Sequence, residues 1–446
     1  MEVIGGAENT AAEESYEHCG CWSVQASVND QWNFLLKMIW DQMIHLVIHF
    51  EGRIDLPTLE LAVREAISAE ILTTSKFTPG DSPYFEPAFP ESDPPVFGVI
   101  TTGSLDITLT DLLGTPLDPL KGPMARIILL RSDNDLLVIS FNHTICDAYG
   151  VKSFGSLLAR LYRSGKRKGM YRPIGNSYDR SFKSILSLFS DEERNAAAGR
   201  LRSWKGAWTI PFDSLRTGER QYIRKTIEQS VFSSIRQYTH SHSFTVNDLL
   251  LSSYVLALME TAPPLPGTCN PVLTSIDLRR YLSPDSYPSL ANLSVAFELP
   301  IIIQENMDLM EIIGHIHELM ASCKSSHAGI GAAALLTNEF GSGFRNVEKN
   351  LADMEEKTLQ GLLGKNPFFT NLGIIPEGVV DYDIPVKDAW MLGPVEYPPG
   401  FCLAASTFRD RLTLSAGYSG AALQREWVIA LLSAMSTSFT PFTSQG

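Results

Sequence analysis

The hydrophobic and polar positions in the first half of the chain alternate between strand and helix spacing. An apolar run of strand length occupies Met43 to Phe50. A segment with apolar residues at helical spacing follows at Leu56 to Ala69, with Asp55 as its cap. Further strands are predicted at 71–77, around Ile107, at 125–130 and at 136–141, and the Pro-rich stretch 79–95 predicts turns around a short strand. The last strand leads to an amphipathic helix with apolar residues at Val151, Phe154, Leu157, Leu158 and Leu161.

The second half repeats this mixture after a polar, partly basic break between 164 and 190. Strands are predicted at 222–228, 271–278, 294–303, 368–374, 401–408 and 412–417, and helices at 246–260, 308–323, 347–363 and 424–436. Two such halves predict an α/β (α+β) fold of two lobes, each a mixed sheet flanked by helices. We expect a mobile leader at 1–22, an N-terminal lobe at 23–170, a linker at 171–190 and a C-terminal lobe at 191–446.

Length and charge narrow the class of protein. At 446 residues the chain is too long for one ordinary core, which agrees with two lobes. The net charge of -14 argues against a nucleic-acid partner, because such binding depends on neutralising phosphates. No apolar run has the length of a membrane span and Met1 to Tyr16 is acidic, unlike a secretory signal, so we expect a cytoplasmic protein. The six cysteines are widely spread, which predicts reduced thiols.

One segment, Ile139 to Gly150, carries candidate chemistry. The predicted strand runs directly into His143, and Asp147 follows four positions later. Polar groups at the carboxyl end of a buried strand lie where α/β folds tend to place reactive groups. Imidazole is the side chain best suited to acid–base work near neutral pH.

In this context the chain resembles the condensation-domain superfamily. That superfamily includes nonribosomal peptide condensation domains, chloramphenicol acetyltransferase, alcohol acyltransferases and polyketide-associated acyltransferases. The resemblance rests on the His-x-x-x-Asp pattern at 143–147 and on the order of the segments 55–66, 116–130, 244–251, 275–282 and 368–373. It implies two chloramphenicol acetyltransferase-like lobes set as a V around a central tunnel, and it says little about the substrate.

The resemblance also implies roles for the motif residues. His143 would be the general base that takes a proton from the acceptor, as a neutral imidazole can. Asp147 would turn away from the tunnel and pair with an arginine of the second lobe, because a buried carboxylate needs such a partner. Arg279 aligns with the family arginine, and Arg280 is the alternative. On a strand, Asp277 and Arg279 would share one face and Arg280 the other.

The chain departs from the family pattern at two positions. Ala148 replaces the glycine that usually follows the aspartate; it keeps its N–H near the developing oxyanion but adds a methyl group, and Gly150 comes two residues later. Asn142 stands where many condensation domains carry a second histidine, which favours the single-histidine alcohol acyltransferases.

Several other residues have two interpretations each. Thr370, Asn371 and Gly373 either line the tunnel and donate to the tetrahedral intermediate or form an ordinary turn. Cys146 is interpreted as a small buried thiol in preference to a nucleophile. The basic stretch from Arg163 to Arg172 is interpreted as a solvated linker, with a phosphopantetheine phosphate or an acidic carrier as the alternative partner.

No metal site is predicted. The segment 18–21, His-Cys-Gly-Cys, has no second cluster nearby to complete four ligands. His240 and His242 are spaced by two, as are His315 and His317, and residues two apart on a helix do not face each other.

The predicted function is acyl transfer from a thioester, acyl-coenzyme A or carrier-bound, to a hydroxyl or amine of a small-molecule acceptor. No cofactor is expected beyond the thioester co-substrate, and we expect a monomer. Two alternatives remain open. One is a free-standing condensation protein that accepts only carrier-tethered groups, and the other is a non-catalytic condensation-like protein that binds a carrier or another partner.

Overall fold

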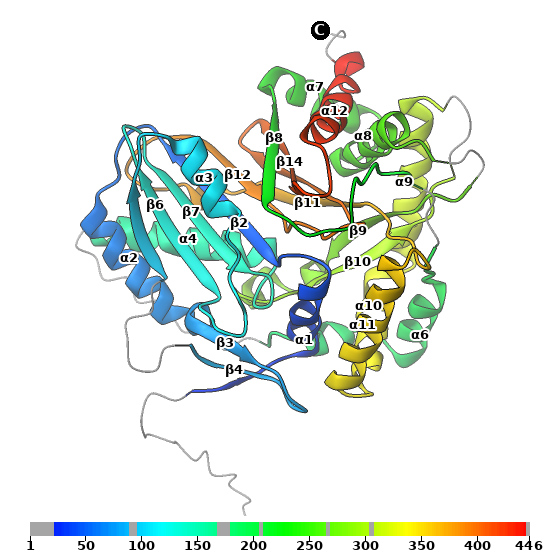
Figure 1. Cartoon of the computed structure of the whole chain (residues 1–446), viewed down its shortest axis with the longest axis horizontal. Coiled ribbons are helices and arrows are strands. Elements are labelled where there is room, and N and C mark those ends of the chain that lie inside the picture. The colour runs from blue at the N-terminus through cyan, green and yellow to red at the C-terminus, as the bar shows by residue number, and fades with distance from the viewer. Residues whose placement is uncertain are drawn as a thin grey trace, which may run out of the picture.

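The computed structural model describes residues 22–88, 96–166, 179–204, 208–264, 268–302 and 307–442. The leader expected at 1–22 lies outside this part of the chain except for Trp22, and so does 171–178 of the expected linker. The described residues form two large sheets and one of three strands. In Figure 1 one large sheet lies on the left and the other toward the right, where most helices of the second half gather.

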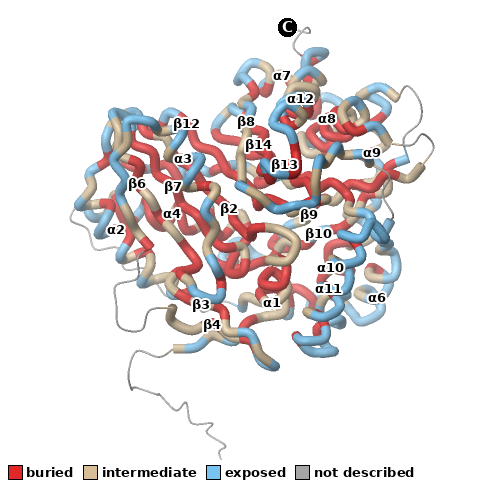
Figure 2. Tube along the Cα trace, in the orientation of Figure 1, coloured by how far each residue is buried: buried red, intermediate tan, exposed pale blue. Residues whose placement is uncertain are grey.

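The first lobe is built on a five-stranded sheet in the order β12-β2-β7-β6-β5. Its strands are β2 (Met43–Phe50), β5 (Phe97–Thr101), β6 (Ala125–Arg131), β7 (Leu136–Asn142) and β12 (Val386–Leu392). Helices α2 (Leu56–Ala69) and α4 (Ala148–Lys166) pack on one face, and α3 (Leu105–Leu113) packs on the other. Coverage on both faces explains why β2 and β7 are apolar runs without alternation. They appear as buried strands in Figure 2.

The second lobe is built on a six-stranded sheet in the order β10-β9-β11-β13-β14-β8. Its strands are β8 (Arg220–Ile227), β9 (Val272–Asp277), β10 (Ser294–Leu299), β11 (Phe368–Ile375), β13 (Cys402–Phe408) and β14 (Arg411–Ser419). Its helices include α7 (Gln229–Ser241), α8 (Val246–Thr261), α9 (Leu309–Ser325) and α12 (Arg425–Thr437), which share a core with one face of this sheet. Helices α5 (Lys183–Leu186), α6 (Asp191–Arg200), α10 (Ala328–Phe340) and α11 (Phe344–Leu359) lie closer to β10 and to the first lobe.

The two lobes interlock through β12. This strand comes late in the chain, yet it pairs antiparallel with β2 at the edge of the first sheet. It also contacts β13 and β14 of the second sheet. Helix α11 adds Phe344, Val347 and Leu351 to the core of the first lobe. Separating the lobes would therefore expose buried apolar surface and break sheet hydrogen bonds.

The remaining elements are short. A three-stranded sheet, β1-β4-β3, consists of β1 (Val24–Gln25), β3 (Ser75–Thr78) and β4 (Tyr84–Pro87). Helix α1 (Val28–Leu35) follows β1 and begins with a capping box of Ser27 and Asp30. In the described part of the chain, no helix is long and apolar enough to cross a membrane.

Most strand and helix expectations are confirmed, and some are wrong. β2 and α2 have the predicted bounds, and Asp55 caps α2 by accepting the Thr58 N–H over 3.1 Å. The strand expected at Ile107 is helix α3, because Leu105, Leu109 and Leu112 recur at helical spacing and Ile107 itself is 65% exposed.

One further expectation needs correction. The strand expected at 71–77 begins as a 3-10 helix at Ile71–Thr74 before β3. Strands β1, β5 and β12 and helices α1, α5, α6, α7 and α10 were not anticipated.

Candidate active site

A cavity of about 560 Å³ is lined by residues of both lobes. The first half of the chain contributes Trp40, His143, Ala148, Tyr149 and Lys152, among others. One wall is a patch of the second sheet. It consists of Leu273, Ser275 and Asp277 from β9, Ser294, Ala296 and Glu298 from β10, and Phe368 and Thr370 from β11. Their neighbours Val295, Phe297, Asn371 and Leu372 also line the cavity.

His143 follows strand β7 directly and lines this cavity. Its backbone N–H donates to Gln42 O over 2.6 Å, and its Nδ1 lies 2.9 Å from Asn292 Oδ1. The Trp40 ring stacks on the imidazole at 5.8 Å between centroids, and the same indole stacks on Phe368 at 6.3 Å. The imidazole ring is thus held at its Nδ1 edge by Asn292 and on one face by Trp40.

Burial governs the protonation of His143. It lowers the pKa of the imidazole below its ordinary value of 6.5. The opposing effects of a hydrogen bond to its own backbone, of the Asp147 charge and of the Asn292 hydrogen bond are smaller. The neutral form therefore dominates at neutral pH. A neutral imidazole on a cavity wall can accept a proton from a bound molecule.

Asp147 pairs with Arg279 of the second lobe. Arg279 Nη1 donates to Asp147 Oδ2 over 2.8 Å, and the two side chains are only 2% and 4% exposed. The guanidinium also donates to Ala291 O over 2.9 Å and to Asp277 Oδ1 over 3.1 Å, and it lies 4.4 Å from the centre of the Tyr149 ring. Burial alone would raise the pKa of Asp147, but the charge and hydrogen bond of Arg279 outweigh it and lower that pKa.

The remaining hydrogen bonds of Asp147 are also structural. Its Oδ2 accepts from Leu293 N over 2.9 Å and from Ser294 Oγ over 3.2 Å. Its Oδ1 accepts the N–H groups of Tyr149 and Gly150 over 3.1 and 3.3 Å, which caps helix α4. Both carboxylate oxygens therefore accept from donors other than His143.

Of the two candidate arginines, only Arg279 contacts Asp147; Arg280 is exposed and lies over the Tyr281 ring. The expected strand alternation is wrong here, because β9 ends at Asp277. The Asp277 carboxylate accepts the Arg279 N–H over 2.9 Å and begins a 3-10 turn.

Ala148 and Gly150 have different surroundings. Ala148 is the first residue of α4 and lines the cavity, and an N–H at this position has no acceptor within its helix. Gly150 is buried and does not belong to the described residues that line the cavity. A Cβ on Gly150 would lie 2.5 Å from the Cβ of Cys146, so glycine is needed there for close packing.

The segment of Thr370, Asn371 and Gly373 combines both earlier interpretations. Thr370 and Asn371 line the cavity, and Thr370 Oγ1 lies 3.3 Å from Ser275 Oγ. Asn371 Oδ1 accepts the Gly373 N–H over 2.9 Å, and Gly373 has a φ of +79°. The pairing of β11 with β13 shifts register at this point, so the turn is a β-bulge within a strand of the cavity wall.

Sequence reasoning missed three residues of this site. Lys152 lies four positions after Ala148 on α4, a spacing that could have revealed it. Its Nζ donates to Leu372 O over 2.6 Å, and burial lowers its pKa. Trp40 and Asn292 have no such signal; Asn292 is 149 positions from His143.

Other candidates lie apart from this chemistry. Cys146 is fully buried, and burial raises the pKa of its thiol well above the ordinary value, as a buried structural thiol requires. The His-Cys-Gly-Cys segment at 18–21 lies outside the described residues. Among the residues that are described, no group of three or more His, Cys, Asp and Glu is placed to hold a metal ion. Of the histidine pair at 315 and 317, His317 instead contacts a carboxylate, with its Nδ1 3.0 Å from Asp248 Oδ2.

No protein-family model and no curated protein matches the chain. Solved structures do match it over nearly its whole length. The TRI3 trichothecene 15-O-acetyltransferase from Fusarium sporotrichioides superposes with a TM-score of 0.68 at 15% identity, covering 95% of this chain and 96% of that one. The first condensation domain of the CDA synthetase gives 0.67 at 14% identity, with 95% and 96% covered.

A third match is polyketide synthase associated protein 5 from Mycobacterium tuberculosis. Its TM-score is 0.66 at 14% identity, covering 94% of this chain and 98% of that one. At identities this low the superpositions show a shared fold alone, and the fold class expected from the sequence is confirmed. The chain shares its fold with this acetyltransferase, this condensation domain and this polyketide synthase associated protein.

Proposed function

We propose that the protein transfers an acyl group from a thioester to a hydroxyl or amine, with His143 as general base. The observation that carries this proposal is the position of the His143 imidazole on the wall of a cavity lined by both lobes, where burial lowers its pKa. Because both lobes line the cavity, an acceptor bound against one lobe can meet a thioester bound against the other. The likeness in fold to an acetyltransferase and to condensation domains supports the same class of reaction.

In the proposed reaction the acceptor gives its O–H or N–H proton to His143 while its oxygen or nitrogen attacks the thioester carbonyl carbon. The carbonyl electron pair moves to oxygen and forms a tetrahedral oxyanion. Collapse restores the carbonyl and breaks the C–S bond, and the leaving thiolate takes the proton from His143. The products are an ester or amide and a free thiol. Acyl-coenzyme A or a phosphopantetheine thioester is the co-substrate.

Two groups on the cavity wall are candidates to stabilise the oxyanion. The Ala148 N–H stands at the start of α4, where the helix dipole also favours negative charge. The Thr370 hydroxyl is on the opposite lobe and lines the same cavity. Gly150 instead allows close packing against Cys146, and Gly373 lies at the β-bulge of β11.

Thiol release provides the test. The protein and its His143→Ala variant are incubated with a panel of acyl-coenzyme A thioesters, with hydroxyl and amine acceptors, and product masses are recorded. Turnover by the wild type and its loss in His143→Ala are expected. Turnover only when the same acyl groups are loaded on a carrier protein would favour a condensation protein. No turnover with either donor class would contradict the acyltransferase proposal and favour a binding role.

A further inference from the structure

We infer that Asn292 positions His143 by holding it in the tautomer that carries its proton on Nδ1, so that Nε2 is the proton acceptor. The inference deepens the proposed function and rests on it for its catalytic meaning. The tautomer itself can be measured without any turnover, so the two ideas can fail separately.

The orientation of the Asn292 amide follows from the two carbonyl groups beside it. Its Nδ2 lies 2.9 Å from His143 O and 3.1 Å from Thr144 O. Carbonyl oxygens only accept, so the NH2 group of the amide must face these two atoms. The amide oxygen is then the atom that faces the imidazole.

The protonation of the ring follows from the amide. Asn292 Oδ1 lies 2.9 Å from His143 Nδ1, and an amide oxygen can only accept, so Nδ1 must be the donor. A neutral imidazole carries a single ring proton. With that proton on Nδ1, Nε2 keeps a free lone pair, which is what a general base needs.

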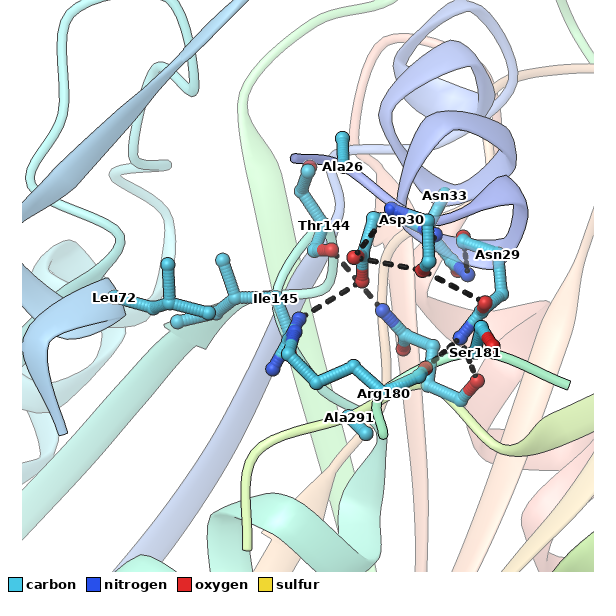
Figure 3. A network of polar contacts seen from close by, with 12 residues as sticks. Ala26, Asn29, Asp30, Asn33, Leu72, Thr144, Ile145, Arg180, Ser181 and Ala291 are labelled. Carbon is cyan, nitrogen blue, oxygen red and sulfur yellow. Dashed lines mark hydrogen bonds and ion pairs between the residues drawn. The ribbon is translucent and has the colours of Figure 1, made fainter. Parts of the chain in front are cut away.

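Asn292 is itself held in place by a network that joins three segments of the chain. Asn29 Nδ2 donates to Asn292 O and also to Arg180 O, the latter over 2.9 Å. Arg180 Nη2 donates to Asp30 Oδ1 over 2.8 Å and to Ile145 O over 3.1 Å. Figure 3 shows Asn29 and Asp30 on α1 facing Arg180, with Ile145 beside its guanidinium. This network fixes the backbone of Asn292, which is 1% exposed. Its side-chain amide could then turn only by breaking its own bonds to His143 and Thr144.

The ring also makes a hydrogen bond to the backbone of His143 itself, which raises its pKa as the Asn292 contact does. The neighbouring side chains other than Asn292 do not set its tautomer. The carboxylate oxygens of Asp147 accept from Arg279, from backbone N–H groups and from a serine hydroxyl. Trp40 stacks on the face of the imidazole, where it makes no hydrogen bond in the ring plane. Asn292 is therefore the side chain at Nδ1.

Two substitutions separate positioning from simple structural support. Asn292→Asp keeps an acceptor for the Nδ1 proton and loses both donations to the carbonyl groups. Asn292→Leu, of similar size, loses all three bonds. If Asn292 sets the tautomer, the Asp variant should retain the Nδ1–H form. The Leu variant should show a weaker preference for it, because only the contact with the backbone of His143 then remains. Asn270→Leu removes another fully buried amide, one that donates to Thr268, and serves as the control.

The direct measurement is 15N NMR of protein labelled with [15N]histidine, with the His143 ring signals identified by their loss in His143→Gln. In the wild type we expect a protonated Nδ1 and an unprotonated Nε2. A wild-type ring with its proton on Nε2 would overturn the inference without any variant. An unchanged tautomer in folded Asn292→Leu would do the same.

Kinetics supply the second readout. For Asn292→Leu we expect kcat to fall by roughly 10- to 100-fold, less than the roughly 100- to 10,000-fold that general-base catalysis as a whole contributes, while KM for the thioester changes little. Asn292→Asp should retain more of kcat than Asn292→Leu. Equal losses in the two variants, with the tautomer unchanged, would mean that Asn292 only supports the loop. The expected tautomer in a wild type that turns over no thioester would uphold the positioning and contradict the proposed function.

Discussion

Burial of His143 decides the pH at which the residue can act as a base. Its pKa lies below 6.5, so the neutral form persists to more acidic pH than for an exposed histidine. We expect kcat/KM to rise with pH as the ring loses its proton, to reach half its maximum below pH 6.5 and to stay level through neutrality. His143→Ala should lower kcat by about 100-fold or more. A pH–rate profile with an acceptor that does not titrate in this range checks both, and a half-maximum above pH 6.5 would contradict the role.

Ala148 and Gly150 are two residues apart, and we expect substitution to be tolerated at Ala148 but to destabilise the protein at Gly150. Ala148→Gly keeps the N–H and removes a methyl group from the cavity wall, so activity should be preserved or raised. Gly150→Ala would place a Cβ 2.5 Å from Cys146 Cβ and 3.1 Å from Ser289 O, at a cost of about 1–3 kcal/mol in unfolding free energy. Initial rates and urea denaturation of both variants test this. A fully stable Gly150→Ala protein would show that the turn can relax.

At the scale of elements, the pair of Asp147 and Arg279 ties the start of α4 to the end of β9. Removing Arg279 leaves Asp147 buried without a counter-charge, so Arg279→Met should cost about 3–5 kcal/mol. Asp147→Asn should cost less, because Arg279 keeps the Asp277 carboxylate at 3.1 Å. The double variant should lose less than the sum, because the two residues share one interaction. Chemical denaturation of the four proteins measures the coupling, and additive losses would contradict the pairing.

The matched control is an exposed ion pair. Arg345 Nε lies 3.0 Å from Asp81 Oδ1, a similar distance, but the side chains are 71% and 92% exposed. Removing either member should change stability little, because solvent screens exposed pairs. A loss there as large as for Asp147 would mean that burial is not the cause.

Helices and strands were predictable from the sequence where the hydrophobic pattern of a segment reflects which of its faces are buried. Strands β2 and β7 are covered on both faces and read as continuous apolar runs, and α2 and α4 carry an apolar face at helical spacing. Helix α3 was mistaken because its exposed Ile107 suggested a strand. Strand β12 was missed because its place in the first sheet depends on pairing with β2, more than three hundred positions earlier in the chain.

At the scale of the whole molecule, the segment between β12 and β13 joins the lobes, and it contains the buried Glu396. Burial raises the pKa of this carboxyl to about 7, although Lys365 opposes the effect. In the described part of the chain, Glu396 Oε2 has no hydrogen-bond partner. Between pH 4.5 and 7 the folded state binds more protons here than the unfolded state, so stability falls as pH rises through this window.

Glu396→Gln removes that charge at nearly constant volume. We expect the variant to have a higher Tm than the wild type at pH 8 and to lose this advantage near pH 4.5, where the wild-type carboxyl is protonated in the folded state. Glu60→Gln, at an exposed position of α2, controls for the loss of one negative charge. An equal difference in Tm at both pH values would contradict this account of Glu396.

The sequence alone determined the alternation of strands and helices, the two-lobed fold class and the segment that bears His143. These properties are local, because hydrophobic spacing, caps and motif order are carried by neighbouring residues. The resemblance also implied an arginine partner for Asp147, with Arg279 preferred and Arg280 as the alternative. The tertiary structure decided that this partner is Arg279, since β9 ends at Asp277 and turns the arginine inward. It also placed Asn292 against the imidazole. Contacts between distant segments depend on how the lobes pack, and no local pattern records that packing.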